Sequence, residues 1–342
     1  MAKINYTDIT NDQLLTLNIL FGGRGMGKTF SVLKHRIEDA DEDETEKSKF
    51  IWMRDSAEVV KKIAAGNSLA APIKAKYPDF PEVTIVKSNG NFHFMKDAAT
   101  DNYKSLGYLM ALSTFHNARG LSYEDVITTT WDEFIPELGT VKPKYQGITF
   151  LNAYETINRN RELDGFDPVK IIFLTNTNGD IYSDVLEDLG VSGIVEDMVH
   201  DNIRTYRDQD TWIEFLENKG FTEAKEKTFL YRHSRNAKFT SMALYNEFSY
   251  NDALIKRKAD LKGSTGLLTV DNKYTLIQLK DKSLYWKLGC WKNLLNYDMD
   301  NDQEAMLFRL LFTDKYRLGY IAGKMFFDSV YTQRAILNYS RF

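Results

Sequence analysis

The sequence predicts an α/β domain followed by a smaller α+β domain. Two domains are expected because a chain of 342 residues exceeds the usual size of one domain. Three observations predict this fold class. A glycine-rich segment, 22–29, separates a strand-like run from a helix-like run. A β-branched run at 125–131 ends at two acidic residues. Short strand-like pieces and two helical stretches then follow, so we expect domains at 1–205 and 229–342, joined by a charged linker at 206–228.

The glycine-rich segment GGRGMGKT has the pattern of a phosphate-binding loop. The run 17–21 before it is typical of a buried strand, and the run 30–37 after it predicts a helix. Glycine permits positive φ and close backbone approach, so successive amides and the helix N-terminus can face phosphate oxygens. We expect Lys28 to reach the β- and γ-phosphates of ATP and the Thr29 hydroxyl to bind Mg²⁺. The residues expected to contact the nucleotide are Gly22, Gly23, Arg24, Gly25, Met26, Gly27, Lys28, Thr29 and Phe30.

The β-branched run supplies the second chemical element, because it ends directly at Asp132 and Glu133. Phosphoryl-transfer enzymes of this type need a carboxylate at a strand end for the magnesium shell. One branch of the P-loop ATPases also uses a neighbouring glutamate to orient and deprotonate the attacking water. We therefore expect Asp132 to bind Mg²⁺ and Glu133 to activate water. Three threonines make this run more polar than is usual for such a strand.

Further candidates follow the next predicted helix, 148–157, and the next predicted strand, 169–175. Ligands sit at the carboxyl ends of parallel strands, so Asn176 is a candidate sensor of the γ-phosphate, with simple strand capping as the alternative. Arg159 and Arg161 are candidates for an arginine finger that reaches a neighbouring subunit. The alternative is that they are surface arginines favoured by the dipole of the helix end.

The composition, 43% hydrophobic and 27% charged, is that of an ordinary globular chain. The sequence contains neither an apolar run long enough to span a membrane nor a signal peptide, so we expect a cytoplasmic protein with no membrane partner. A single cysteine, Cys290, excludes an intramolecular disulfide. The five histidines show no metal-ligand spacing, and we expect no structural metal.

The net charge of −4 is unevenly distributed along the chain. Residues 1–228 contain 26 Lys and Arg against 37 Asp and Glu, whereas residues 229–342 contain 18 against 11. A basic C-terminal third beside an acidic N-terminal part indicates a polyanionic partner. The ordinary variation of charge between small domains is the alternative explanation.

The remaining segments predict how the two domains are built. The acidic run 38–46 is expected to be a solvated connection. Two short runs flank Asn89-Gly90 and predict a hairpin that leaves the main sheet. In the C-terminal part, strand-like and helical patterns alternate irregularly. We expect strands at 238–245, 267–270, 274–279 and 284–288, and helices through 306–311 and 320–327.

Three stretches taken together, GGRGMGKT, TTTWDEFIPE and ETINRNRE followed by KIIFLTNTN, resemble the DNA-packaging motor ATPases of phi-twenty-nine-like phages. The resemblance covers the first 180 residues best, and the C-terminal stretch YRLGYIAGKMFFDSVYTQRAI is similar less specifically. Arg24 matches an arginine of the family's loop, and Asp132-Glu133-Phe134 matches its second acidic element. The sequence Arg159-Asn160-Arg161-Glu162 matches the segment whose first arginine acts in trans, which favours Arg159 over Arg161.

The resemblance implies a P-loop additional-strand catalytic-glutamate ATPase domain, followed by a ribonuclease-H-like domain that has lost its nuclease centre. It implies a homomeric ring, five subunits in the family, that docks on the portal (connector) of an empty procapsid. The ring would pump double-stranded DNA inward with ATP and Mg²⁺. Whether a packaging RNA or an accessory factor joins the ring is left open. The implied location is the host cytoplasm, transiently on the procapsid and not in the mature virion.

One departure from the family concerns the residues that hold DNA. The family's pore-facing lysine after the second strand has no counterpart at Ser56 or Ala57. Arg54, Lys61 and Lys62 are the nearby candidates for this role.

Three other functions were weighed against DNA packaging by such a ring. A headful-type large terminase with an active nuclease needs two or three converging carboxylates, one of them from its first strand. The expected first strand, 239–245, contains none. A ring ATPase of conjugation or chromosome transport usually has a membrane anchor or a winged helix, and neither is found. A non-catalytic scaffold stabilised by ATP would not need Glu133 beside Asp132.

Overall fold

The computed structural model describes residues 6–88, 90–100, 102–118, 122–136, 145–176, 183–234, 240 and 253–340. The chain divides into two compact units, Met1–Ser249 and Tyr250–Phe342. Each unit contains its own β-sheet, with nine strands in the first and five in the second. The predicted mixed α/β architecture is therefore confirmed.

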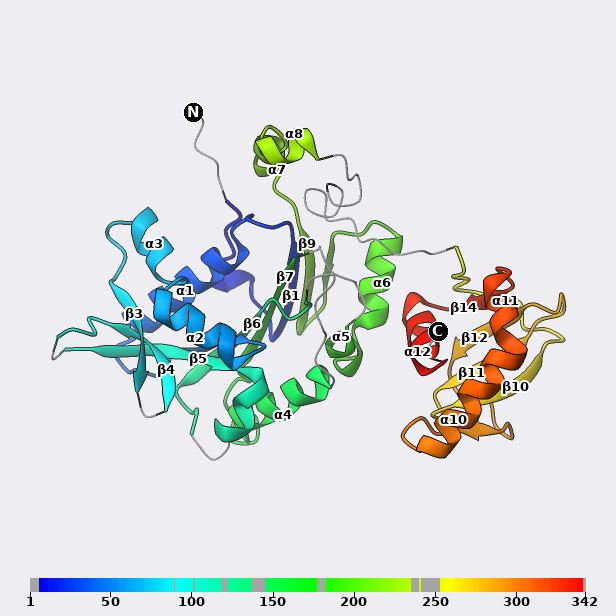
Figure 1. Ribbon diagram of the computed structural model, residues 1–342. Coiled ribbons are helices and arrows are strands. Elements are labelled where there is room, and N and C mark those ends of the chain that lie inside the picture. Colours follow the sequence, from blue (N-terminus) through cyan, green and yellow to red (C-terminus); the bar gives the residue numbers. More distant parts are fainter. Residues whose placement is uncertain are drawn as a thin grey trace. The chain divides into compact units, whose positions relative to one another are not determined.

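The first unit is built on one large, mostly parallel sheet (Figure 1). Its strand order is β3-β4-β5-β2-β6-β7-β1-β9-β8. The strands from β5 to β9 in this order pair in parallel, while the β3–β4 hairpin and β8 pair antiparallel at the two edges. The strand bounds are β1 Leu17–Gly22, β2 Lys49–Arg54, β3 Val83–Ser88, β4 Asn91–Lys96, β5 Lys104–Ala111, β6 Val126–Asp132, β7 Lys170–Asn176, β8 Thr205–Arg207 and β9 Thr211–Leu216.

Helices cover both faces of this sheet, because successive side chains of a buried parallel strand point to opposite faces. On β1, Ile19 and Phe21 pack into the hydrophobic cluster that includes α4, α5 and α6, and Leu20 packs into the cluster that includes α1, α2 and α3. The helix bounds are α1 Lys28–Glu42, α2 Ala57–Gly66, α3 Ala71–Lys76, α4 Gln146–Asn158, α5 Asp184–Asp188, α6 Ser192–His200, α7 Lys219–Glu226 and α8 Phe229–His233, with 3₁₀ turns η1 Asn11–Gln13 and η2 Leu112–Ala118.

The position of β7 in the sheet decides which residues meet. β7 lies between β1, which leads into the glycine-rich segment, and β6, which ends at Asp132. In the pairing register Gly22 is opposite Asn176, and Asp132 is opposite Leu174. The carboxyl ends of three parallel strands therefore bring the glycine-rich segment, the acidic pair and Asn176 to one edge of the sheet.

Two expectations about the first half of the chain are corrected. The acidic run 38–46 is not simply a connection, because α1 continues through Glu42. Its carboxylates are paired with bases, as in the ion pairs of Asp39 with Arg36 and of Asp41 with Lys96. The hairpin β3–β4 does not leave the main sheet, since β4 pairs with β5 and extends that sheet at its edge.

The linker expected at 206–228 is also corrected. β9 pairs in parallel with β1 along its whole length, and Trp212, Ile213, Phe215 and Leu216 are buried. The first compact unit extends beyond this segment, to Ser249. The sequence did not predict β9 because the few apolar residues of this strand lie in a segment that is otherwise rich in charged residues.

The second unit contains a five-stranded sheet of order β13-β10-β11-β12-β14. β10, β11 and β12 form an antiparallel meander, β13 pairs in parallel with β10, and β14 pairs in parallel with β12. Trp286 and Phe308 lie at its fully buried centre. The bounds are β10 Thr265–Val270, β11 Tyr274–Gln278, β12 Leu284–Leu288, β13 Asn296–Tyr297, β14 Met325–Phe327, α10 Asp302–Leu311, α11 Arg317–Ile321 and α12 Val330–Ser340, with a π-helical turn, η3, at Phe312–Tyr316.

Most of the expected elements of this unit are found where they were predicted. The exception is the helix through 320–327, because α11 ends at Ile321 and β14 follows it. Gly323 has φ of 66°, a left-handed conformation that ends the helix and redirects the chain. The expected strand at 238–245 lies outside the described residues, apart from residue 240. None of the helices in the described ranges has both the length and the apolar character needed to cross a membrane.

The sheet predicts one stability effect that can be compared with a matched control. A Cβ added at Gly107 in β5 would lie 2.5 Å from the carbonyl oxygen of Phe50 on β2, whereas one added at Gly193 in α6 meets nothing within 4 Å. Gly107→Ala should lower the free energy of unfolding by about 1–3 kcal/mol through overpacking. Gly193→Ala should raise it by up to about 1 kcal/mol through helix propensity. Urea unfolding of both variants checks this, and equal stabilities would contradict the assigned packing.

Candidate functional site

The glycine-rich segment forms a tight loop between β1 and α1. Gly25 and Gly27 have φ of 82° and 100°, left-handed conformations in which side chains are strained. Gly27 is the N-cap of α1, which starts at Lys28. A cap without a side chain leaves the first amides of the helix open, and the helix dipole adds partial positive charge there. The loop therefore has the properties of an anion site.

Lys28 is held in the floor of this loop. Its Nζ donates to the carbonyl oxygens of Gly22 and Gly23 over 2.8 and 3.2 Å, and to Asn176 Oδ1 over 3.2 Å. The side chain is buried, and this burial lowers the pKa of Lys28 to about 8, although nearby Asp132 opposes the shift. The hydrogen-bond partners of Lys28 are all neutral oxygens, so an anionic ligand would further stabilise its charge.

Thr29 and Asp132 face each other at the loop. Thr29 Oγ1 lies 3.1 and 3.2 Å from the two carboxylate oxygens of Asp132. Asp132 is 3% exposed, and its burial raises the pKa of the carboxyl, while the Arg54 guanidinium acts in the opposite direction. A hydroxyl and a carboxylate at this separation fit two neighbouring ligands of one magnesium ion, which prefers oxygen donors.

Arg54, at the end of β2, joins the two acidic residues. Its Nη1 lies 3.0 Å from Asp132 Oδ2, and its Nη2 pairs with Glu133 Oε2. Glu133 has φ of 60°, and its amide donates to the carbonyl of Leu174 over 2.8 Å. This turn ends β6 and leaves the Glu133 carboxylate half exposed beside the loop. The sequence suggested Arg54 as a DNA-holding residue, but the structure pairs it with both carboxylates.

A cavity of about 350 Å³ lies over the loop, within the size range of small-molecule sites. Its lining combines the loop, Asn176 and an aromatic edge: Tyr6, Gly25, Met26, Gly27, Lys28, Thr29, Phe30, Lys76 and Asn176. Of these, Tyr6 and Lys76 were not found by sequence reasoning, because each is remote in sequence from the glycine-rich segment. No local pattern distinguishes either residue from an ordinary surface residue.

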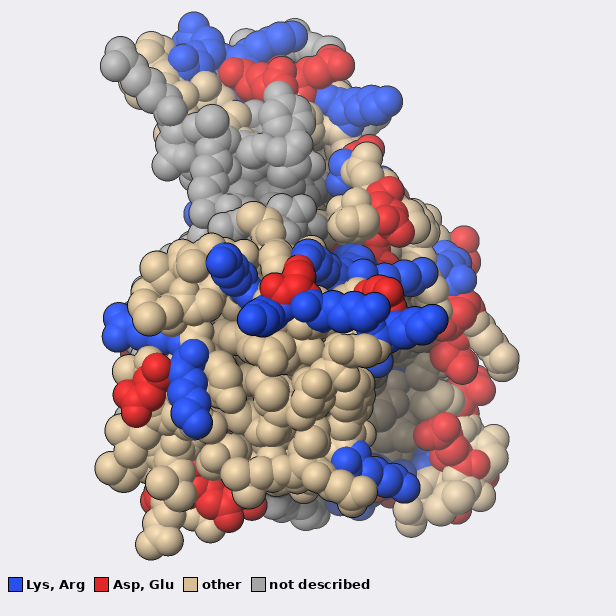
Figure 2. All heavy atoms as spheres, turned by 90° about the vertical axis from the view of Figure 1, so that its right-hand side faces the viewer, with Lys and Arg blue, Asp and Glu red and all other residues tan. Residues whose placement is uncertain are grey.

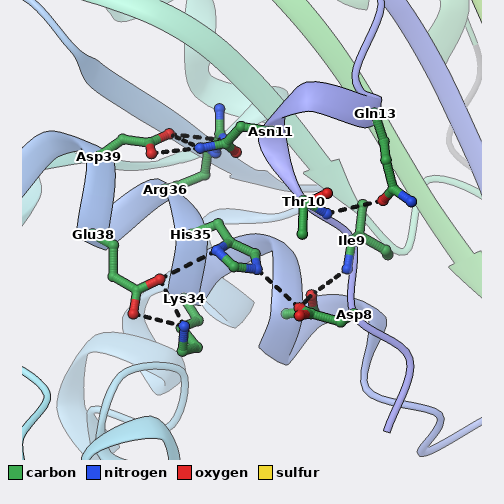
Figure 3. Close-up of polar contacts among 11 residues, drawn as sticks. Asp8, Ile9, Thr10, Asn11, Gln13, Lys34, His35, Arg36, Glu38 and Asp39 are labelled. Atoms are coloured by element: carbon green, nitrogen blue, oxygen red, sulfur yellow. Dashed lines mark hydrogen bonds and ion pairs between the residues drawn. The ribbon is translucent and has the colours of Figure 1, made fainter.

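The N-terminal strap, residues 6–13, binds α1 from outside (Figure 3). The Ile9 amide donates to Ser31 Oγ over 2.7 Å, and Ser31 Oγ donates to Asp8 Oδ1 over 3.0 Å. His35 Nε2 also lies 2.9 Å from Asp8 Oδ1, and Asn11 contacts Asp39 at the far end. These contacts fix the strap on the helix that begins at the glycine-rich loop.

The two candidate finger arginines differ in their surroundings. Arg161 donates to the backbone carbonyls of Glu124, Val126 and Asp167 over 3.1–3.2 Å, so it fastens the end of α4 to neighbouring segments. Arg159 is the C-cap of α4, is exposed, and has φ of 45°. Its geometry leaves Arg159, rather than Arg161, facing solvent at this helix end. Lys61 and Lys62 on α2 are exposed as well.

Residues 5–284 match the family model of the podovirus DNA encapsidation protein (Gp16). The chain belongs to this family. As an encapsidation protein it packages viral DNA. The DNA packaging protein of Bacillus phage B103 is 24% identical over an alignment of 334 residues, and the match covers 92% of this chain and 92% of that protein.

Two solved structures share the fold of this encapsidation protein over nearly its whole length. The phi-28 gp11 DNA packaging motor has a TM-score of 0.62 at 16% identity, covering 95% of this chain and 94% of that one. The bacteriophage phi-29 viral genome packaging motor assembly has a TM-score of 0.62 at 18% identity, covering 96% and 95%. At such identities the likeness concerns the fold.

One partly buried acid beside the site of the encapsidation protein, Asp55, has a raised pKa. Asp55 follows Arg54 at the end of β2, and its Oδ1 accepts a hydrogen bond from Trp131 Nε1 over 2.9 Å. Burial raises the pKa of Asp55 to about 6, against the opposing effect of the Trp131 hydrogen bond. The ionised form is therefore less favourable in the folded chain than in the unfolded one.

The raised pKa of Asp55 predicts a pH-dependent effect of Asp55→Asn. As pH rises from the ordinary aspartate pKa of 3.8 to about 6, the unfolded chain loses this proton first, so folding stability falls over that window. At pH 7 the free energy of unfolding of the Asn variant should be about 2 kcal/mol higher than that of wild type. At pH 4 this difference should vanish. Denaturant unfolding at both pH values measures this, with exposed Asp79→Asn as the control. A pH-independent difference would show that Asp55 does not titrate in this way.

Proposed function

We propose that this encapsidation protein is the Mg²⁺-dependent ATP hydrolase that drives double-stranded DNA into a preformed capsid. The observation that carries the proposal is the convergence of Lys28, Thr29, Asp132, Glu133 and Asn176 at one edge of the sheet. The insertion of β7 between β1 and β6 supports an additional-strand catalytic-glutamate ATPase.

The proposed roles follow from the positions of the side chains. The loop amides and Lys28 bind the phosphates, and the negative charge of ATP opposes the burial that lowers the pKa of Lys28. Thr29 and Asp132 would hold Mg²⁺, which would neutralise developing phosphate charge. Asn176 reaches Lys28 from β7 and is placed to respond to the terminal phosphate.

Glu133 is the proposed base that orients and deprotonates water, and Arg54 governs when it can act. In this structure Glu133 Oε2 is paired with the Arg54 guanidinium. We propose that this pair separates when Glu133 orients the attacking water. Arg54 also pairs with Asp132, so a metal ion held by Asp132 would compete with Arg54 for that carboxylate.

The assembly we propose is a homomeric ring, with five subunits, docked at the portal of the procapsid in the host cytoplasm. In this ring Arg159 reaches the nucleotide of the neighbouring subunit and stabilises transition-state charge. Its exposure at the C-cap of α4 supports that role. Loss of the phosphate contact after hydrolysis would then change the subunit interface and move the DNA.

The second unit is the proposed ribonuclease-H-like domain that meets the portal and nucleic acid. The meander β10-β11-β12 with β13 parallel to β10 supports this fold, and β10 itself contains no acidic residue, which supports the loss of nuclease chemistry. Figure 2 shows Lys and Arg side chains gathered in a band over one face of the molecule. Within the unit, the Lys256 amide donates to the carbonyl of Phe327 in β14, and the Leu284 amide of β12 donates to the carbonyl of Lys324, so both lysines lie beside this pair of strands. Lysine side chains suit phosphate contacts that carry no sequence information.

The proposed chemistry is tested by nucleotide turnover with and without double-stranded DNA. Wild-type protein should hydrolyse ATP with Mg²⁺ and accelerate when DNA is added. Glu133→Gln should lower turnover by about 10²–10⁴-fold while ATP still binds, because only the base is lost. Lys28→Ala should lose ATP binding. Exposed Glu155→Gln on α4 is the matched control, and substantial hydrolysis by the Glu133 variant would refute the assigned base.

The trans role of Arg159 is tested by mixing subunits. Arg159→Ala alone should bind ATP but lose turnover by about 10³-fold or more. Mixing it with Lys28→Ala should restore part of the activity, because some interfaces then combine an intact loop with an intact Arg159. Mixing it instead with the Lys28→Ala, Arg159→Ala double variant should restore nothing. Equal activity of the two mixtures would mean that Arg159 acts within its own subunit or not at all.

A further inference from the structure

We infer that Tyr6, Phe30 and Lys76 form the subsite for the aromatic base of the nucleoside triphosphate, with Tyr6 as the stacking surface. The inference rests on the proposed function, and it deepens it by assigning residues outside the phosphate-binding motif. All three side chains line the cavity that also contains Lys28 and Thr29.

The cavity has two chemically different ends. One end contains the loop backbone, Lys28 and Thr29, which suit phosphates and a metal ion. The other end contains the rings of Tyr6 and Phe30 and the ammonium of Lys76. A nucleotide has the same two-ended character, with a charged triphosphate and a flat, largely apolar base. Once its phosphates occupy the loop, the base is directed toward the aromatic end.

The N-terminal strap holds Tyr6 at the entrance of the loop. The Thr7 amide donates to the carbonyl of Met26 over 3.1 Å, and a Cβ built on Gly27 would lie 3.0 Å from Tyr6 Cβ. The contacts of Asp8 with Ser31 and His35 bind the following residues of the strap to α1 (Figure 3). Tyr6 is nevertheless 43% exposed, so its ring offers a face to a ligand.

Lys76 supplies a cation from an unrelated part of the chain. It is the last residue of α3, which lies in the segment between β2 and β3 and has no part in the phosphate-binding motif. Its Nζ lies 4.2 Å from the ring centroid of Tyr6 and 4.8 Å from that of Phe30. The ring faces of Tyr6 and Phe30 are both turned toward the Lys76 ammonium. A flat aromatic base in the position of this ammonium would lie against a ring face.

A nucleotide can replace this contact with better ones. The base stacks on Tyr6 in place of the ammonium, and base–aromatic stacking tolerates any base because each has a π-face. The displaced Lys76 stays beside the negatively charged nucleotide and can donate to its α-phosphate or to a ring nitrogen. Tyr6 therefore contributes only to ligands that carry a base, whereas Lys76 contributes charge.

The experiment compares two ligands, ATP and inorganic triphosphate, which has no base. Calorimetric titration with Mg²⁺ should show that Tyr6→Ala binds ATP about 10- to 100-fold more weakly than wild type. Its affinity for triphosphate should be unchanged. Tyr6→Phe, which keeps the ring, should bind ATP like wild type. Lys76→Met, which keeps the length but not the charge, should weaken ATP binding about fivefold or more at low salt.

Tyr77→Ala is the matched control for the aromatic substitution. Tyr77 belongs to the same ring cluster, with Lys76 Nζ 5.4 Å from its centroid, but does not line the cavity. This variant should bind ATP like wild type. Equal losses for ATP and triphosphate in Tyr6→Ala, or unchanged ATP binding in both Tyr6→Ala and Lys76→Met, would overturn the subsite. Wild-type protein that binds neither ligand would instead overturn the proposed function.

Discussion

The parallel pairing of β7 with both β1 and β6 is the constraint on which the site depends. It brings three strand ends together, so that Lys28 meets Asp132 and Asn176, each of which lies more than a hundred positions after it in sequence. The hydrogen bonds between strands fix which residues lie opposite each other. A shift of the register by one residue would move every side chain of the strand to the other face of the sheet. The buried clusters on both faces of the sheet prevent such a slip, because each contains alternate residues of β1 and β2.

The charged side chains of the site differ in how their charges are compensated. Lys28 and Asp132 are both buried, and burial opposes the charge of each. Arg54 compensates the acidic pair, while Lys28 is surrounded by neutral oxygens. The site therefore has a cation hydrogen-bonded by neutral oxygens where a triphosphate would bind and a guanidinium where magnesium and water would act. Burying the charges of Lys28 and Asp132 costs free energy. A charged ligand that pairs with these groups would lower this cost and could thereby change which residues are paired.

The sequence pointed to candidate residues more readily than to the residues that surround them. The loop 22–29 and the pair Asp132-Glu133 follow strand-like runs, and each type of residue is tied to a short local pattern that can be read directly. Arg54 was assigned to DNA because its pairing with the acidic residues depends on β2 lying beside β6. Tyr6 and Lys76 were missed because neither belongs to a pattern near the loop. Strand β9 was taken for a linker because a single strand buried by its neighbours needs only a few apolar residues.

What the sequence by itself determined is the chemistry of the loop and of the two carboxylates, since glycine conformations and side-chain functional groups are properties of single residues and their immediate neighbours. Only the tertiary structure decided that Arg54 holds both carboxylates, that residues 211–216 complete the sheet beside β1, and that Tyr6 and Lys76 border the loop. These are contacts between segments far apart in the chain. They arise from sheet order and from packing across it, which no local pattern of residues encodes.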